Sequence, residues 1–282
     1  MRINDYEIQK MTLEDLKTAV NWAAREGWNP GLHDAECFFE ADDSGFFKGV
    51  IDGEMVSSIS VVKYDAEFAF LGFYIVRPDY RGKGLGYSIW NESLKGMEGF
   101  CIGLDGVVAQ QENYRKSGFQ YAYKNTRFRG VSQGQNPTPV QTKDALQIPM
   151  DGVAEFDERF FPTERKGFLR KWLNHAATSR AYVEDGEIKG YGVLRKCLNG
   201  FKFGPLFAEN GCIARIIFAE ILDTIPEGEE FFLDVPEPNR EGLSLVREYG
   251  MEPVFETARM YTNKMPDLPT EKIFGVTTFE LG

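Results

Sequence analysis

The chain has 282 residues, enough for two ordinary domains, and its 43% of hydrophobic residues suffices for sizeable cores. It carries 43 acidic and 32 basic side chains, a formal net charge of −11, which disfavours nucleic acid and anionic membranes as partners. No stretch approaches the ~20 apolar residues of a membrane-spanning helix and the first residues form no signal peptide, so we expect a cytoplasmic protein.

The first half of the sequence predicts a mixed α/β domain with a largely antiparallel meander. Thr12 is followed three residues later by Asp15, the spacing of a capping box, which predicts that a helix begins at Leu13. Alternating and β-branched stretches separated by turn residues predict the strands. In chain order the expected elements are a strand at 7–10, helices at 13–26 and 34–40, strands at 45–51, 55–64 and 69–76, a helix at 85–95, a strand at 100–105, a helix at 113–117 and a strand at 119–128.

The second half of the sequence repeats landmarks of the first. Asp52-Gly53, which predicts a hairpin turn, returns as Asp185-Gly186, 133 residues later. Gly118-Phe119, which predicts a helix end, returns as Gly250-Met251, 132 residues later. Two nearly equal offsets indicate a duplicated domain rather than a short repeat.

The composition changes between the two copies. Residues 130–143 carry Gly, Ser, Gln, Asn, Pro and Thr with few large apolar side chains, which is typical of a linker. We therefore expect a first domain at 1–130, a linker at 131–143 and a second domain at 144–282.

The cysteines predict neither disulfides nor a metal site. They are far apart, form no C-x-x-C pair and stand beside apolar residues, so we expect reduced thiols in the core at Cys37, Cys101, Cys197 and Cys212. Only two histidines accompany them, without the local spacing of structural zinc sites, so no metal is expected.

The most informative segment predicts a strand, a glycine-rich turn and a helix start. It runs from Tyr74 to Trp90 and reads YIVRPDYRGKGLGYSIW. Such a turn presents unpaired N–H groups at the positive end of a helix, which favours a phosphate group. The alternating glycines fit neither the P-loop nor the G-x-G-x-x-G dinucleotide motif, which disfavours a nucleotide-binding enzyme. An ordinary surface turn would require neither Arg81 nor an immediate helix.

This segment resembles the acyl-CoA pyrophosphate loop of the GNAT acetyltransferase superfamily, Arg/Gln-x-x-Gly-x-Gly/Ala. Arg81, Gly84 and Gly86 match the motif, and Val76 and Pro78 match its V-x-P lead-in. The resemblance implies tandem GNAT folds, each a mostly antiparallel twisted sheet flanked by helices, with acetyl-CoA as the acyl donor. It also implies that the strand before the loop pairs with pantetheine and supplies an oxyanion donor. The implied contacts with acetyl-CoA are Phe73, Tyr74, Ile75, Val76, Arg81, Gly82, Lys83, Gly84, Leu85, Gly86, Asn113 and Tyr114.

Tyr114 is the expected proton donor. It stands four residues before a Gly-Phe pair, where the family carries a tyrosine that protonates the departing CoA thiolate. A phenol with a pKa of about 10 is protonated at pH 7, so the residue suits this role. The structural alternative is a core tyrosine whose hydroxyl bonds to a neighbour.

The general base is expected among acidic residues near the same strand. In some relatives a Glu on the strand before the loop deprotonates the amine, and Glu67 lies close to that position here. Asp65 and Asp105 are further candidates. Solvated carboxylates, or a carboxylate that accepts N–H groups of a turn, are the structural alternatives.

The acceptor site is expected after the first helix. The family forms it from a helix-loop-helix, which predicts substrate contacts at Trp28, Asn29 and Asp34. Trp offers a cation–π face and Asp a counter-charge for an amine. Residues 28–31, Trp-Asn-Pro-Gly, equally suit a simple helix stop and turn.

The second copy lacks the phosphate loop. Residues 203–210 precede its helix without the glycine pattern, and Val246 stands where the first copy has Tyr114. The resemblance therefore extends to two-domain acetyltransferases with a degenerate C-terminal GNAT-like domain, which can wall the acceptor pocket or pair with the first sheet.

These features predict an acetyl-CoA-dependent N-acetyltransferase that transfers its acyl group directly to a primary amine. The acceptor is a small-molecule amine or a lysine side chain, and the protein is a monomer or a homodimer. The alternative function is a non-catalytic acyl-CoA-binding sensor or scaffold protein. The undefined base and the degenerate second copy support this alternative.

Overall fold

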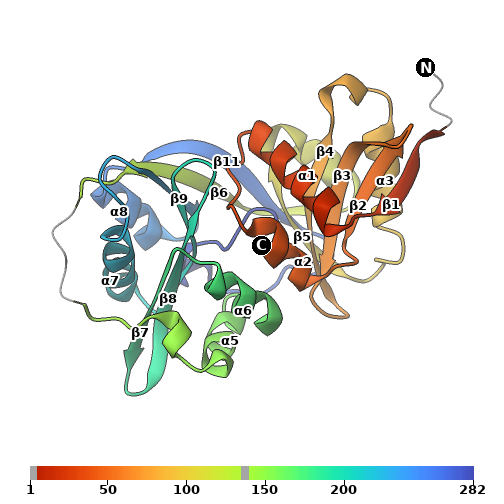
Figure 1. Cartoon of the computed structure of the whole chain (residues 1–282). Coiled ribbons are helices and arrows are strands. Elements are labelled where there is room, and N and C mark those ends of the chain that lie inside the picture. Colours follow the sequence, from red (N-terminus) through yellow and green to blue (C-terminus); the bar gives the residue numbers. More distant parts are fainter. Residues whose placement is uncertain (1–4, 135–139) are drawn as a thin grey trace.

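The computed structural model describes residues 5–134 and 140–282, so residues 135–139 of the predicted linker lie outside it. Both halves contribute to a single twelve-stranded, mostly antiparallel sheet with helices packed on it (Figure 1). In the described residues no helix is long and apolar enough to cross a membrane. The mixed α/β class predicted from the sequence is confirmed.

The first half follows the predicted element order. Its helix α1 begins with the predicted capping box, in which Thr12 and Asp15 bond reciprocally across the first turn. The elements are β1 (Glu7–Lys10), α1 (Leu13–Arg25), α2 (Asp34–Ala41), β2 (Phe46–Ile51), β3 (Glu54–Lys63), β4 (Phe68–Val76), α3 (Leu85–Ser93), β5 (Cys101–Val107), α4 (Gln111–Lys116) and β6 (Gln120–Val131), with short 3₁₀ turns at Pro78–Tyr80 and Val108–Gln110.

Within the described residues the second half repeats this order from α1 to β6 and adds one further strand, β12. The Asp-Gly pairs at 52–53 and 185–186 all have φ between 51° and 83°, as a two-residue hairpin turn requires. The elements are α5 (Met150–Glu158), α6 (Lys166–Asn174), β7 (Thr178–Glu184), β8 (Glu187–Lys196), β9 (Phe201–Ala208), α7 (Gly211–Leu222), β10 (Glu230–Pro236), α8 (Arg240–Glu248), β11 (Glu252–Tyr261) and β12 (Ile273–Gly275), with 3₁₀ turns at Ala145–Gln147 and Thr270–Lys272.

One apolar core joins the two halves. Side chains from α1 and α2 of the first copy and from α5 and α6 of the second share it. At its centre Phe38 stacks on Trp172 with ring centroids 6.0 Å apart, and both rings are fully buried. Helix α3 packs in a separate core of the first copy, and α7 and α8 pack in a core of the second.

The two copies exchange their last long strands. The strand order is β1-β2-β3-β4-β5-β11-β6-β10-β9-β8-β7, so β11 of the second copy pairs with β5 of the first, and β6 of the first pairs with β10 of the second. Two buried ion pairs connect strands of different copies in the same way. Arg127 on β6 binds Asp234 on β10 at 2.7 and 2.8 Å, and Arg259 on β11 binds Asp105 on β5 at 2.6 Å. The second copy therefore forms part of the surroundings of β5.

In the first copy, the parallel strands β4 and β5 separate half-way along their length. They pair only from Phe68 and Cys101 to Leu71 and Leu104. Beyond this point Phe73 adopts a φ of 47° in a bulge of β4 opposite Ser58–Ser60 of β3, and its carbonyl accepts a hydrogen bond from the Ser58 hydroxyl at 2.6 Å. The separation leaves a cleft between the second halves of these strands.

The prediction that the cysteines are buried core thiols is confirmed for two of the four. Cys37 and Cys197 are buried, Cys101 is half-buried, and Cys212 is exposed, so the expectation of a core thiol is wrong for Cys212. This residue follows the first residue of α7, on a side of the helix that faces solvent rather than the sheet. Among the described residues no group of three or more His, Cys, Asp or Glu side chains is arranged to hold a metal ion.

Candidate active site

A cavity of about 590 Å³ occupies the cleft between β4 and β5. The lining residues come from β4, from β5 and α4, and from β11 and the last residues of the chain. Most of the site residues expected from the sequence line it, namely Trp28, Phe73, Tyr74, Ile75, Val76, Arg81, Gly82, Gly84, Leu85, Gly86 and Tyr114. Lys83, Asn113, Asn29, Asp34 and Glu67 lie outside its lining.

The glycine-rich loop forms one end of this cavity. Gly82 and Gly84 have φ of 76° and 81°, in the left-handed region that favours glycine. Gly84 is the N-cap of α3, and no side chain caps this helix end. Gly86 faces Tyr74 so closely that a Cβ would stand 2.6 Å from the tyrosine hydroxyl. The loop therefore presents the N-terminal N–H groups of α3 to the cavity, which favours an anionic ligand.

The cations of the loop are held by exposed partners. Arg81 donates from Nε to the Val76 carbonyl at 2.8 Å and pairs with Glu26, which also lines the cavity. Lys83 donates to the Asp79 carbonyl at 2.8 Å. Since the Arg81–Glu26 pair is solvent-exposed, it contributes little stability and leaves the guanidinium available to a phosphate.

Tyr114 contributes a phenol to the lining of the cavity. It projects from α4 against Trp90, with the rings stacked and centroids 5.8 Å apart. The other neighbour of the ring is Gly106, where a Cβ would overlap the Tyr114 ring, so only glycine fits there. The residue is 8% exposed, and its hydroxyl forms no hydrogen bond with the described residues. Burial, followed by the nearby Tyr74, raises the pKa of Tyr114 to about 12, so the phenol is protonated at neutral pH.

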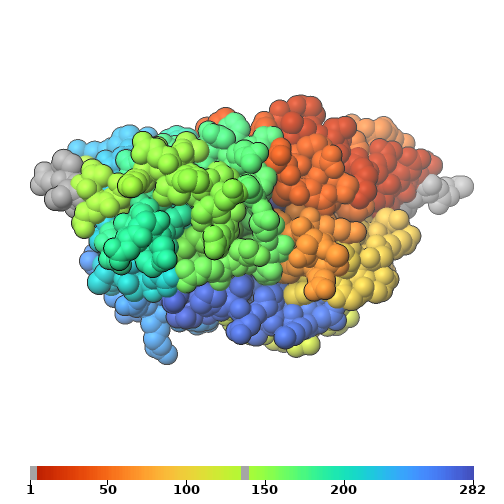
Figure 2. All heavy atoms as spheres, turned by 90° about the horizontal axis from the view of Figure 1, so that it is seen from below, coloured from red at the N-terminus to blue at the C-terminus, as the bar shows by residue number. Residues whose placement is uncertain are grey.

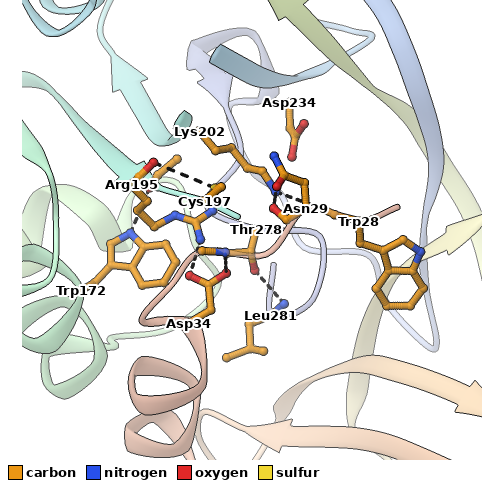
Figure 3. Close-up of polar contacts among 12 residues, drawn as sticks. Trp28, Asn29, Asp34, Trp172, Arg195, Cys197, Lys202, Asp234, Thr278 and Leu281 are labelled. Carbon is orange, nitrogen blue, oxygen red and sulfur yellow. Dashed lines mark hydrogen bonds and ion pairs between the residues drawn. The ribbon is translucent and has the colours of Figure 1, made fainter. Parts of the chain in front are cut away.

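Two of the three expected acceptor contacts join the two halves instead of facing the cavity. The Asn29 side chain exchanges two hydrogen bonds with the backbone of Asn199, at 2.8 and 2.9 Å. The Asp34 carboxylate is buried and pairs with Arg195 of β8 (Figure 3). Trp28 alone lines the cavity. The partners of Asn29 and Asp34 belong to the second copy, and the spacing of residues in the sequence does not predict these long-range contacts.

The expected bases are also placed away from the cavity or already bound. Glu67 is exposed in the turn between β3 and β4, and Asp65 accepts the N–H groups of Glu67 and Phe68 at 2.7 and 2.6 Å. Asp105 lines the cavity, but its carboxylate is fully buried and accepts hydrogen bonds from a guanidinium, an amide and a hydroxyl, those of Arg259, Asn125 and Thr257.

Sequence reasoning missed four residues from the second half of the chain that line the cavity. Phe255 and Thr257 come from β11, and Phe279 and Glu280 come from the last segment of the chain. Figure 2 shows this part of the chain, in blue, crossing the junction between the two halves. No motif marks these residues in the sequence, because only the strand exchange brings them to the first copy.

Comparison with known proteins identifies the family. A family model described as the acetyltransferase (GNAT) family matches residues 13–119, and one described as an acetyltransferase (GNAT) domain matches residues 153–275. The chain is 33% identical over 272 residues to holothin acyltransferase of Pseudoalteromonas sp. (strain SANK 73390), covering 96% of this chain and 92% of that protein. The chain belongs to the GNAT acetyltransferase family. Acyl transfer is the reaction that this membership assigns to it.

Solved structures share the two-domain GNAT fold. A putative acetyltransferase from Pyrococcus horikoshii superimposes with a TM-score of 0.83 at 19% identity, covering 100% of this chain and 98% of that one. A tandem GNAT protein from the clavulanic acid biosynthesis pathway superimposes with a TM-score of 0.65 at 14% identity, covering 93% and 99%. The predicted two-domain GNAT architecture is confirmed.

The second GNAT domain has no counterpart of the loop. Helix α7 begins at Gly211, and the side chain of Asn210 caps it by accepting the Ile213 N–H at 3.1 Å. Val246, at the position corresponding to Tyr114, is buried on α8. The helix end that has no side-chain cap in the first domain is therefore closed by a side chain in the second.

Proposed function

We propose that this GNAT protein is an acetyl-CoA-dependent N-acetyltransferase, in which acetyl-CoA is a substrate and the acceptor is a primary amine. The observation that carries the proposal is the arrangement of Tyr114 and the Gly84 loop in one cavity. An uncapped helix end suited to a phosphate and a buried, unbonded phenol are the two groups that a CoA thioester requires.

The residues present fit acetyl-CoA. The pyrophosphate would lie at the N-terminus of α3, with Gly82 and Gly84 allowing its close approach. The pantetheine arm would follow residues 73–76 of β4, which have no strand partner on the side of β5. Backbone N–H groups of the same segment would stabilise the oxyanion of the reacting thioester.

The chemistry assigned to Tyr114 is proton donation. The amine attacks the thioester carbonyl carbon, the C–N bond forms and the C–S bond breaks, and the thiolate takes the proton of the Tyr114 hydroxyl. Because this phenol is buried and protonated at neutral pH, it is ready to donate in each cycle.

A small-molecule amine suits the cavity better than a protein lysine. The cavity volume of about 590 Å³ lies in the range of small-molecule sites, and the aromatic side chains of Trp28, Phe255 and Phe279 are among its lining residues. The name of the 33% identical relative makes holothin the first acceptor to assay.

Thiol release from acetyl-CoA tests the function directly. The purified chain should release CoA thiol in the presence of holothin or another member of a primary amine panel, and mass spectrometry should find the matching N-acetyl product. Tight CoA binding without thiol release for every amine in the panel would contradict the enzyme and support an acyl-CoA sensor.

Replacing Gly84 with Ala should weaken acetyl-CoA binding by about tenfold, because a Cβ at φ 81° strains the loop by roughly 1–3 kcal/mol and shifts its N–H groups. Calorimetric titration with CoA measures the effect. Gly53→Ala is the matched control, since Gly53 has φ 78°, equally open surroundings and a place in a turn outside the cavity lining. Equal CoA affinity of the two variants would show that the loop does not hold CoA.

A further inference from the structure

The second GNAT domain fills its own cleft with part of the chain. Its strands β9 and β10 pair in parallel only from Phe201 and Phe231 to Phe203 and Leu233. Where they separate, β12 pairs with β9, and Asn239 donates to the Ile273 carbonyl at 2.9 Å. The cleft that receives acetyl-CoA in the first domain thus anchors an internal segment in the second.

From this anchor the chain continues into the cavity of the first domain. The segment 276–282 is buried throughout. It is fixed by hydrogen bonds from Arg165 to the Thr277 hydroxyl at 2.8 Å and from the Tyr64 hydroxyl to the Leu281 carbonyl at 2.9 Å. Its backbone at Glu280 packs on Gly72 of β4, so closely that a Cβ at Gly72 would overlap the Glu280 carbonyl. The segment is therefore a fixed wall of the cavity beside the strand that would hold the thioester.

Glu280 is the unpaired acid in a buried group of charges. Two neighbouring pairs, Arg127 with Asp234 and Arg195 with Asp34, are closed ion pairs. Lys202 donates to the carbonyls of Trp28 and Asn29, at 3.2 and 2.7 Å (Figure 3). Glu280 is 4% exposed and lines the cavity, and its carboxylate forms no hydrogen bond or ion pair with any described residue.

We infer that Glu280 binds the ammonium group of the acceptor and takes its proton, so that it is the general base of the acyl transfer. This inference rests on the proposed N-acetyltransferase function. A buried carboxylate without a partner is costly, and a cationic substrate group that enters the cavity supplies the missing partner. Trp28 and Phe279 also line the cavity, and aromatic faces suit an ammonium group.

The other acids near the cavity are less suited to this role. Glu26 pairs with Arg81 at the loop, and Asp105 is held by Arg259. Glu67 lies outside the cavity lining. Of these carboxylates, only Glu280 both lines the cavity and is free of a protein partner within the described chain.

The charges around Glu280 adjust its basicity. Burial raises the pKa of Glu280 above its ordinary value, and Asp34 on α2 raises it further. Lys202 on β9, Arg127 on β6 and Arg195 on β8 oppose this rise. A carboxylate with a raised pKa is a stronger base, which suits proton abstraction near neutral pH.

The proton balance of the reaction closes with Glu280 and Tyr114. The Glu280 carboxylate takes one proton from R–NH₃⁺, and the neutral amine attacks the thioester. When the C–S bond breaks, the thiolate takes the Tyr114 proton, and the second proton lost by nitrogen returns to the Tyr114 phenolate. Glu280 then releases its proton to water, so that R–NH₃⁺ and acetyl-CoA yield the amide, CoA thiol and one H⁺.

Two acceptors of nearly the same shape test this role. Benzylamine is an ammonium ion at neutral pH and requires a base, whereas phenylhydrazine is neutral at that pH and does not. Glu280→Gln should lower kcat/KM by about 10²-fold with benzylamine and by less than about threefold with phenylhydrazine. The affinity for CoA should be unchanged, and the benzylamine rate of the variant should rise with pH as the free amine accumulates. Glu271→Gln, an exposed glutamate in the turn before β12, is the matched control and should leave both rates unchanged.

Each outcome bears on a different claim. An equal loss with both amines and an unaltered pH profile would assign Glu280 a structural role and overturn the inference alone. Full activity of Glu280→Gln with benzylamine would overturn it as well. Absence of thiol release by the unmodified protein with every amine would instead contradict the N-acetyltransferase function, and the role of Glu280 with it.

Discussion

Replacing Tyr114 with Phe should lower kcat by about 10³-fold and leave the affinity for acetyl-CoA within about twofold. The ring of Tyr114 packs against Trp90 and Phe119, and phenylalanine preserves these contacts. The hydroxyl has no hydrogen bond within the described structure, so its removal leaves no buried group unpaired. Thiol-release kinetics together with calorimetric CoA binding measure the two effects separately.

The buried environment of Tyr114 also determines how activity should depend on pH. With a pKa of about 12, the phenol keeps its proton well above neutral pH, so ionisation of Tyr114 should cause no loss of activity between about pH 8 and pH 10. Tyr121→Phe is a suitable control, because Tyr121 is exposed and lies outside the cavity lining. Unchanged turnover of Tyr114→Phe would remove Tyr114 from the mechanism and require another acid.

The sequence indicated those residues of the cavity lining that follow local patterns. Gly82, Gly84 and Gly86 alternate because the turn requires left-handed backbone at the first two and a small residue against Tyr74 at the third. Tyr114 follows from its spacing to the helix-ending Gly118, whose φ is 89°. Local geometry dictates these residues, so local patterns indicate them.

The acceptor side could not be predicted in this way. Asp34 suggested a counter-charge for an amine, but a buried carboxylate is stabilised by whichever cation the fold supplies, and that cation is Arg195, 161 residues later in the chain. Glu280 lies in a segment without a recognisable motif and reaches the cavity only because the cleft of the second domain holds β12. A duplicated sequence indicates two similar domains, but it does not indicate that they exchange strands.

Replacing Arg127 with Met should lower the free energy of unfolding by about 3–5 kcal/mol. Arg127 binds both oxygens of Asp234 and donates to the Trp28 carbonyl at 2.6 Å, and both side chains of the ion pair are almost fully buried. Burial alone would raise the pKa of Asp234, but Arg127, with smaller contributions from Lys202 and Arg195, lowers it below its ordinary value. The variant leaves this carboxylate buried without its cation, at the point where β6 enters the sheet of the second domain. Denaturant unfolding monitored by circular dichroism measures the change.

Arg129→Met provides the matched control for this prediction. Arg129 lies two residues further along β6 and pairs with Glu230 and Glu252 at 3.3 and 3.4 Å, on the same two neighbouring strands, but its side chain is exposed. Exposed pairs contribute about 0–1 kcal/mol, so this variant should change stability little. Since the lowered pKa of Asp234 stabilises the folded state only where the unfolded carboxyl is ionised, the difference between the two variants should be largest near neutral pH and shrink as the pH falls below about 4. Equal stabilities of the two variants at neutral pH would mean that the exchanged strands are held by apolar packing alone and that the reciprocal ion pairs do not secure the junction on which the cavity depends.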